Sequence, residues 1–276
     1  AGEATGPIKT KLHPRLSTSA KWIWSIYLVL TIACILSYYV AGMGLFDSFN
    51  YAMTTTATGG FSTHNTSTEF FHSPSLEYIC TFFCFLSGVN FTLLYAAVIK
   101  FKIKELFRNS EFRFYIFLVT VFSIFIMVEL IVMRNYDIEH AFRSAIFQVV
   151  SFITTTGLFN DDAALWPHVT WVVLSMCMFI GACSGSTSGG LKCIRGVILL
   201  RMVKNEFRQI LHPNAVLPLK IDGVNVPMQK RVTLLAFLTI YLIICVIISF
   251  TMIAMGIDNT NSITITLSCI GNVGPT

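Results

Sequence analysis

Charged side chains are scarce in this sequence, and their scarcity is the first indication of its class. They make up 12% of the 276 residues, while apolar residues make up 54%. An ordinary soluble domain carries roughly 25% charged residues, so a soluble fold would have too few charges to cover its surface. Disorder is excluded by the same composition. The sequence therefore predicts a polytopic integral membrane protein.

Paired cysteines and catalytic motifs are also lacking. None of the eight cysteines belongs to a CxxC pair and most lie in apolar runs, so we expect neither a disulfide framework nor a zinc site. There is no nucleophile–base set, phosphate-binding loop or metal cluster. We therefore predict no enzymatic activity and no organic cofactor. The net charge of +5 is small, and its distribution indicates a membrane lipid partner rather than nucleic acid.

Five apolar runs are long enough, or nearly so, to cross a bilayer as helices, since a core of ~30 Å needs about 20 helical residues. The runs are 22–40, 76–99, 114–133, 166–183 and 232–255. Three further segments are too polar to span and too apolar for ordinary loops: 45–63, 138–160 and 258–276. Each predicts a short helix that enters the membrane and returns as an extended stretch, so the fold class is all-α.

The basic residues set the expected topology. Seventeen of the 19 Lys and Arg residues lie before the first run, between the second and third, or between the fourth and fifth. By the positive-inside rule these segments are cytoplasmic. The alternation works only if the three intermediate segments return to the side from which they enter.

The chain thus reads as a span, a re-entrant segment and a span, repeated. The re-entrant tips align if Gly60, Gly157 and Gly274 are equivalent, with spacings of 97 and 117 residues. An insertion at 204–229 explains the longer interval. Gly59 and Gly271 are competing choices of register in the first and third tips.

The tips have the composition of an ion-selectivity filter. Backbone carbonyls can replace the water of a potassium ion when a short strand turns them inward; Gly permits the unusual φ and ψ, and Thr adds a stiff side chain. The preceding helix would direct its negative dipole end at the cation. Ordinary Thr- and Gly-rich turns are the alternative, disfavoured by three equivalent occurrences. The predicted filter residues are Thr58, Gly59, Gly60, Thr155, Thr156, Gly157, Asn272, Val273 and Gly274.

The fourth apolar run ends in a stretch too rich in Gly and hydroxyl residues to remain a good helix. Non-helical backbone at membrane depth must face water or polar protein, which favours a mobile barrier beneath the filter. A close helix–helix contact through small residues is the alternative. The predicted gating-loop residues are Gly181, Ser184, Gly185, Ser186, Thr187, Ser188, Gly189, Gly190 and Lys192.

These features divide the chain into six parts: a cytoplasmic segment (1–21), a first repeat (22–101), a cytoplasmic linker (102–113), a second repeat with a broken second span (114–208), a cytoplasmic hairpin (209–229) and an incomplete third repeat (230–276). Asp222-Gly223 is the expected turn of the hairpin, which is a candidate contact for a regulator.

The sequence resembles the TrkH/KtrB family of potassium transporters, and is more similar to the TrkH branch. The resemblance rests on residues 59–65, 154–157, 181–192, 212–216 and 272–275. It implies span–pore-helix–span repeats around one pseudo-fourfold pore, as in a potassium channel, with residues 181–192 as the intramembrane gating loop. It also implies a homodimer, a cytosolic nucleotide-binding regulator of the RCK type, and the cytoplasmic (inner) membrane as location. Leu158 departs from the Phe that is usual in the family.

The resemblance matches repeats two, three and the front of repeat four, so we expect a further Thr/Gly tip upstream of Ala1. The function it implies is uptake of potassium, the transported ion, down its electrochemical gradient. Two alternatives stay open: an ion-coupled secondary transporter of a small solute, and a non-transporting membrane sensor. The sequence leaves channel-like flux and symport equally possible.

Overall fold

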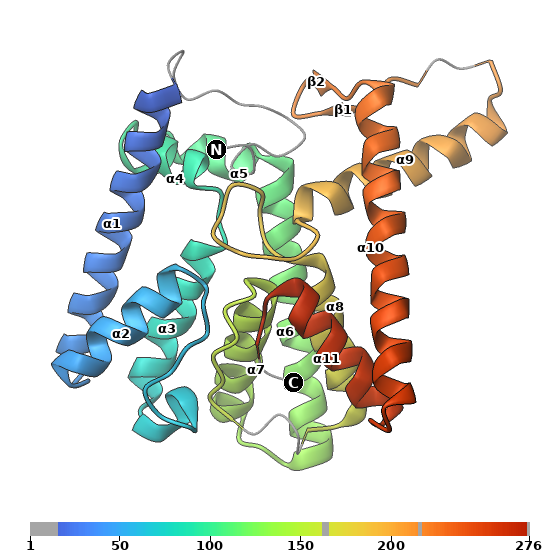
Figure 1. Ribbon diagram of the computed structural model, residues 1–276. Helices are drawn as coiled ribbons and strands as arrows, with labels where there is room; N and C mark the ends of the chain where they lie inside the picture. The colour runs from blue at the N-terminus through green and yellow to red at the C-terminus, as the bar shows by residue number, and fades with distance from the viewer. Residues whose placement is uncertain (1–15, 162–165, 215–216, 275–276) are drawn as a thin grey trace.

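The computed structural model describes residues 16–161, 166–214 and 217–274, which form a bundle of helices with one small hairpin (Figure 1). Parts of three ranges used above lie outside the described residues: 1–15 of the predicted cytoplasmic segment, 215–216 of the stretch 212–216, and 275–276 of the third re-entrant segment.

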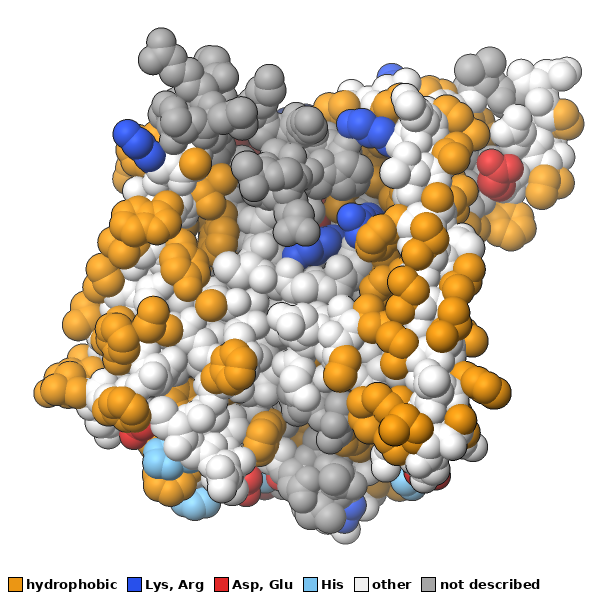
Figure 2. All heavy atoms as spheres, viewed as in Figure 1, with side chains coloured by type: hydrophobic (Ala, Val, Ile, Leu, Met, Phe, Trp, Pro, Cys, Tyr) orange, Lys and Arg blue, Asp and Glu red, His pale blue; other side chains and the backbone are white. Residues whose placement is uncertain are grey.

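Among the described residues, three single helices are long and apolar enough to cross a membrane. They are α1 (Leu16–Val40), α6 (Ser110–Arg134) and α10 (Met228–Ala254). The fourth predicted run forms the shorter α8 (His168–Ile180) and the fourth-to-fifth connection begins with α9 (Cys193–Leu211). Large apolar side chains on α1 and α10 are exposed, as Figure 2 shows on their outer faces, and such faces suit contact with lipid.

The predicted span at 76–99 is not one continuous helix, although its two pieces together are long and apolar enough to form a broken span. The structure has two helices there, α3 (Pro74–Ser87) and α4 (Phe91–Val98), bent by 104° at the break. Asn90 starts the second helix by accepting a hydrogen bond from the Thr92 amide at 2.8 Å, which is the usual role of an N-cap side chain. Gly88 permits the close packing at the bend, because a Cβ there would lie 2.7 Å from Thr154 and Tyr115.

Each of the three re-entrant segments begins as a short helix. These helices are α2 (Leu45–Thr56), α7 (Ile138–Ile153) and α11 (Asn259–Gly271). Figure 1 shows all three in the same half of the bundle, with their C-terminal ends directed toward its middle. Buried aromatic residues, among them Tyr38, Tyr51, Tyr115, Phe147 and Phe152, fill the space around α2 and α7.

The hairpin and the two short helices α4 and α5 (Ile103–Arg108) gather at the opposite end from the re-entrant helices (Figure 1). Strands β1 (Lys220–Ile221) and β2 (Val224–Asn225) pair antiparallel around Asp222 and Gly223, both of which have positive φ. That conformation is the one expected of a two-residue hairpin turn. A 3₁₀ turn, η1 (Ser67–Phe71), lies between the first tip and α3.

Candidate functional site

The three tips share one backbone conformation. Thr58 and Gly60 have φ values of 52° and 73°, Thr155 and Gly157 have 55° and 79°, and the pair in the third tip, Asn272 and Gly274, has 58° and 111°. The residue between the two in each tip, which is Gly59, Thr156 or Val273, does not have a positive φ. Equivalence of Gly60, Gly157 and Gly274 therefore fits the backbone, whereas Gly59 and Gly271 would put the tips out of register.

This alternation matters for what the tips can bind. In a regular β-strand, successive peptide groups point to opposite sides, and the positive φ of the first and third residues of each tip departs from that conformation. A row of carbonyl oxygens on one side is the arrangement needed to replace the hydration shell of a cation.

Each tip is fixed by the same pair of hydrogen bonds to its own helix. The amide of Thr58 donates to Thr55 O at 3.3 Å, that of Thr155 to Phe152 O at 3.2 Å, and that of Asn272 to Cys269 O at 3.3 Å. The next amide in each tip donates to the carbonyl five residues earlier, at 2.8, 2.8 and 2.9 Å. The helices α2, α7 and α11 therefore end in the same pattern of backbone hydrogen bonds.

Three hydroxyl residues, which the sequence interpretation missed, support the tips from behind. Thr54 Oγ1 accepts a hydrogen bond from the Phe61 amide at 2.7 Å, and Ser268 Oγ accepts one from the Gly274 amide at 3.0 Å. Ser151 Oγ instead donates to Leu158 O at 2.5 Å. All three hydroxyl residues are buried. They repeat with the spacings of 97 and 117 residues that relate the glycines, so carrying the repeat back along each helix could have found them.

The first and second tips are in direct contact. A Cβ built on Gly60 would lie 2.2 Å from Thr156 O, so only glycine fits this position. On the outer side, the Thr68 hydroxyl and amide donate to Phe159 O at 2.6 and 3.1 Å. Leu158, where the sequence departs from its family, is fully buried and packs in the core behind the second tip.

A buried ion pair joins the first repeat to the second. Arg143 of α7 donates from Nη1 to Glu77 Oε1 of α3 at 2.7 Å, and Asn160 Nδ2 donates to Glu77 Oε2 at 2.5 Å. Glu77 is 5% exposed, and a buried carboxylate needs such partners. The pair gives Arg143, one of two basic residues outside the predicted cytoplasmic segments, a structural role between the two repeats.

The predicted gating loop lies against the ends of all three re-entrant helices. Thr187 Oγ1 donates to Thr56 O at 3.1 Å at the end of α2, and the Gly189 amide donates to Thr155 Oγ1 at 2.6 Å at the end of α7. A Cβ on Gly189 would lie 2.2 Å from Gly271 O at the end of α11. The loop crosses the middle of the bundle between the tips and the hairpin end (Figure 1).

Other loop residues close the loop on itself. The Ser186 hydroxyl donates to Cys183 O at 2.5 Å and lies 2.8 Å from the Ser188 hydroxyl. Lys192 donates from Nζ to Ser188 O. Gly181 and Gly190 pack backbone to backbone, since a Cβ on Gly190 would lie 2.9 Å from Gly181 Cα. The Gly185 carbonyl accepts a hydrogen bond from the Phe91 amide at 3.1 Å, the first residue of α4.

Asp258 caps the N-terminus of α11 at the far end from its tip. Hydrogen bonds from the Thr260 hydroxyl and amide hold the pKa of the Asp258 carboxyl below its ordinary value. The charge favours the positive end of the helix dipole. The negative end of the dipole is left facing the tip.

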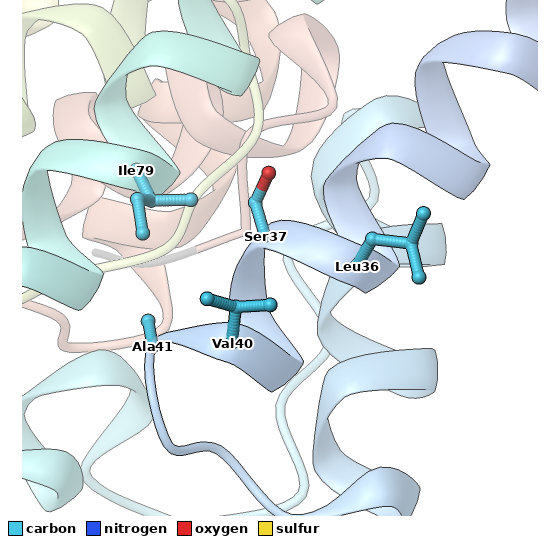
Figure 3. Close-up of a pocket in the computed structure, with 5 residues that line it drawn as sticks. All are labelled: Leu36, Ser37, Val40, Ala41 and Ile79. Carbon is cyan, nitrogen blue, oxygen red and sulfur yellow. The ribbon is translucent and has the colours of Figure 1, made fainter.

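An apolar hollow of ≈ 450 Å³ lies away from the tips, between α1 and α3. Its lining is Leu36, Ser37, Val40 and Ala41 of α1 and Ile79 of α3 (Figure 3). The Ser37 hydroxyl is already bonded to Ala33 O at 2.8 Å. The hollow offers no row of oxygen ligands, so the tips and the loop remain the candidate site.

No cluster of three or more His, Cys, Asp or Glu side chains suited to a metal ion occurs among the described residues. All eight cysteines are free thiols.

Three helices long enough to cross a membrane, three short helices that end in glycine-containing tips, and an irregular segment between α8 and α9 are features of a multi-pass membrane protein. Comparison with known proteins assigns it further. The model of the TrkH family, described as cation transport protein, matches residues 4–276, and the chain belongs to this family.

Named relatives agree with that assignment. The Trk system potassium uptake protein TrkH of Halomonas elongata is 34% identical over 99% of this chain and 57% of the relative. The Trk system potassium uptake protein TrkG of Escherichia coli is 35% identical over 99% of this chain and 56% of the relative. The crystal structure of the potassium transporter TrkH from Vibrio parahaemolyticus superimposes with a TM-score of 0.88 at 34% identity, covering 96% of this chain and 57% of that one. The chain thus spans a little over half the length of the relatives it matches.

Proposed function

We propose that this chain takes part in potassium uptake across the cytoplasmic (inner) membrane, through a carbonyl-lined selectivity filter controlled by an intramembrane gating loop. The observation that carries the proposal is the repeated backbone of the tips, which places Thr58–Gly60, Thr155–Gly157 and Asn272–Gly274 in one conformation at the ends of three re-entrant helices. The named relatives are potassium uptake proteins, which supports potassium as the ion.

The gating role rests on the contacts of the loop. It touches Thr56, Thr155 and Gly271 at the inner ends of the tips, so an ion leaving the filter toward the cytoplasm would meet it. We propose further that the protein works as a homodimer and that a cytosolic nucleotide-binding regulator of the RCK type acts on the hairpin end, where β1, β2 and α9 lie together (Figure 1).

The experiment is uptake in a bacterial strain that lacks its own potassium uptake systems. The protein as its gene encodes it should restore growth at low potassium and take up rubidium as a tracer, in competition with potassium and much less with sodium. Flux that depends strictly on a second ion's gradient would favour a coupled transporter. A complete lack of flux with normal membrane insertion would favour a sensor and contradict the proposal.

Orientation is tested separately by cysteine accessibility. A cysteine replacing Phe61, which is 82% exposed beside the first tip, should react with an impermeant reagent from outside. A cysteine replacing Arg108 at the end of α5 should react only from the cytoplasm. Reaction of position 108 from outside would overturn the re-entrant topology.

A further inference from the structure

A buried carboxylate holds both ends of the gating loop. Glu111 lies in the first turn of α6 and is 3% exposed. Its Oε1 accepts hydrogen bonds from the Ser184 amide at 2.5 Å and the Ile194 amide at 3.1 Å, and its Oε2 accepts one from the Ser184 hydroxyl at 3.0 Å.

The two amides come from opposite ends of the irregular segment. Ser184 follows α8 by a few residues, while Ile194 is in the first turn of α9. One carboxylate therefore ties the entry of the loop to its exit. A backbone hydrogen bond from the Cys193 amide to Ala182 O at 2.9 Å closes the same base, so the part between these points must project as a loop toward the tips.

Among the described residues, the hydrogen bonds of the Glu111 carboxylate go to the two ends of the loop. No salt bridge joins Glu111 to a basic side chain there. A buried carboxylate is costly unless its oxygens are hydrogen-bonded, and the three hydrogen bonds that Glu111 accepts come from Ser184 and Ile194. Hydrogen bonds to a charged acceptor are among the stronger ones in proteins.

We propose that Glu111 is a positioning residue for gating, and that its carboxylate sets where the loop stands beneath the filter. The inference rests on the proposed function, since it assigns a residue to the loop's control. Loss of the carboxylate releases both ends together, which lets the segment from Gly185 to Gly190 move away from Thr56, Thr155 and Gly271 more often.

The test compares Glu111→Ala and Glu111→Gln with Glu129→Ala, a change of the other carboxylate near the opposite end of the same helix. Basal potassium flux is measured in proteoliposomes, without any regulator, on the protein as its gene encodes it. Glu111→Ala should raise basal flux on the order of tenfold, the ratio given by about 1.4 kcal/mol. Glu111→Gln keeps one acceptor oxygen and should give a smaller rise. Glu129→Ala should match the parent protein.

Two further readouts separate positioning from general damage. The preference for potassium over sodium should stay within about twofold of the parent in every variant, because the tips are unchanged. A cysteine replacing Ser186 should react faster with a cytosolic thiol reagent when Glu111 is replaced. A merely structural role would lower flux and leave this rate unchanged.

Deleting 185–189 in parallel keeps the two proposals distinguishable. If the deletion raises flux while Glu111→Ala leaves both flux and Ser186→Cys reactivity at parent levels, the role of Glu111 is overturned and the gating loop stands. If the deletion leaves flux unchanged, the gating function fails, and the reactivity at Ser186→Cys alone decides whether Glu111 positions the loop. Should Glu111→Ala not fold, Glu111→Gln and Ser184→Ala decide the question by the same readouts.

Discussion

The tips and the loop at 181–192 are both irregular, glycine-rich backbone inside a helical bundle, yet they are held differently. Each tip is bonded to its own helix, as Thr58 is to Thr55 and the Phe61 amide to Thr54. The loop has hydrogen bonds within itself, such as Ser186 to Cys183, and is also bonded to distant parts of the chain, as Ser184 is to Glu111 and Thr187 to Thr56.

This difference suggests how one region stays fixed while the other moves. A tip tied to the helix that precedes it moves only if that helix moves, so its geometry is preserved whatever the rest of the bundle does. A loop whose position depends on contacts with other helices can shift when those contacts are lost, because its internal hydrogen bonds, such as Ser186 to Cys183, do not tie it to the tips. The proposed filter and the proposed gate thus depend on different kinds of contact.

The largest expected effect comes from filling the contact between the first two tips. Gly60→Ala should abolish potassium-selective uptake, because the new Cβ would lie 2.2 Å from Thr156 O and the residue has positive φ. Gly274→Ala is the matched variant, since its φ is 111° but no atom lies within 4 Å of its Cβ position. Gly274→Ala should lose less selectivity than Gly60→Ala, because it introduces only the backbone strain of a positive φ, which costs about 1–2 kcal/mol. Potassium–sodium competition in rubidium uptake measures both, and equal losses would show that the tip contact is unimportant.

Removing the loop should change rate rather than selectivity. Deletion of 185–189 removes the contact of Gly189 with Thr155, so potassium flux should rise several-fold and respond less to a regulator. The filter's ion preference should stay nearly constant, because the tips keep their own hydrogen bonds. Flux and competition assays on the same preparations check this, and abolished flux would contradict the gating role.

A smaller effect is expected from the hydroxyl residues behind the tips. Ser151→Ala removes the 2.5 Å hydrogen bond to Leu158 O, which typically costs about 1 kcal/mol, and should lower both selectivity and thermal stability. Thr251→Ala on α10 is the control, because its exposed hydroxyl bonds only to Ile247 and Ile248 of its own helix. A normal filter in Ser151→Ala would mean that the backbone bonds suffice to fix a tip.

The smallest effect is expected at the cytoplasmic hairpin. Asp222 accepts hydrogen bonds from Asn109 Nδ2 at 3.1 Å and the Ser110 hydroxyl at 2.5 Å, next to Glu111 in the chain. Asp222→Asn preserves the size of the side chain, and Asn also tolerates positive φ. The change should therefore weaken only the hydrogen bonds from Asn109 and Ser110. Basal flux should change by less than about twofold, while limited proteolysis should cut the hairpin faster. Glu206→Gln, an exposed position on α9, would control for loss of a negative surface charge. Unchanged proteolysis of Asp222→Asn would mean that β1 and β2 are held by their apolar side chains alone.

Much of the architecture could be predicted because it depends on local pattern. The Asp222-Gly223 turn and the starts of α2, α7 and α11 lie within about three residues of the predicted positions. The break between α3 and α4 was missed, since its apolar composition continues through Gly88 and Asn90. Only the packing of Thr154 and Tyr115 against Gly88 shows why the helix bends there.

The sequence by itself determined the membrane class, the three-fold recurrence of the tips and the weakness of the helix at 181–192, because hydropathy, repeat spacing and helix propensity are properties of neighbouring residues. Only the tertiary structure decided that Glu77 pairs with Arg143 and that Glu111 joins Ser184 to Ile194. It also decided that the loop contacts Thr155 and Gly271 at the ends of two re-entrant helices. Glu111 and Ser184 are 73 residues apart, and nothing in the local sequence of either fixes which partner a buried carboxylate meets when the helices pack.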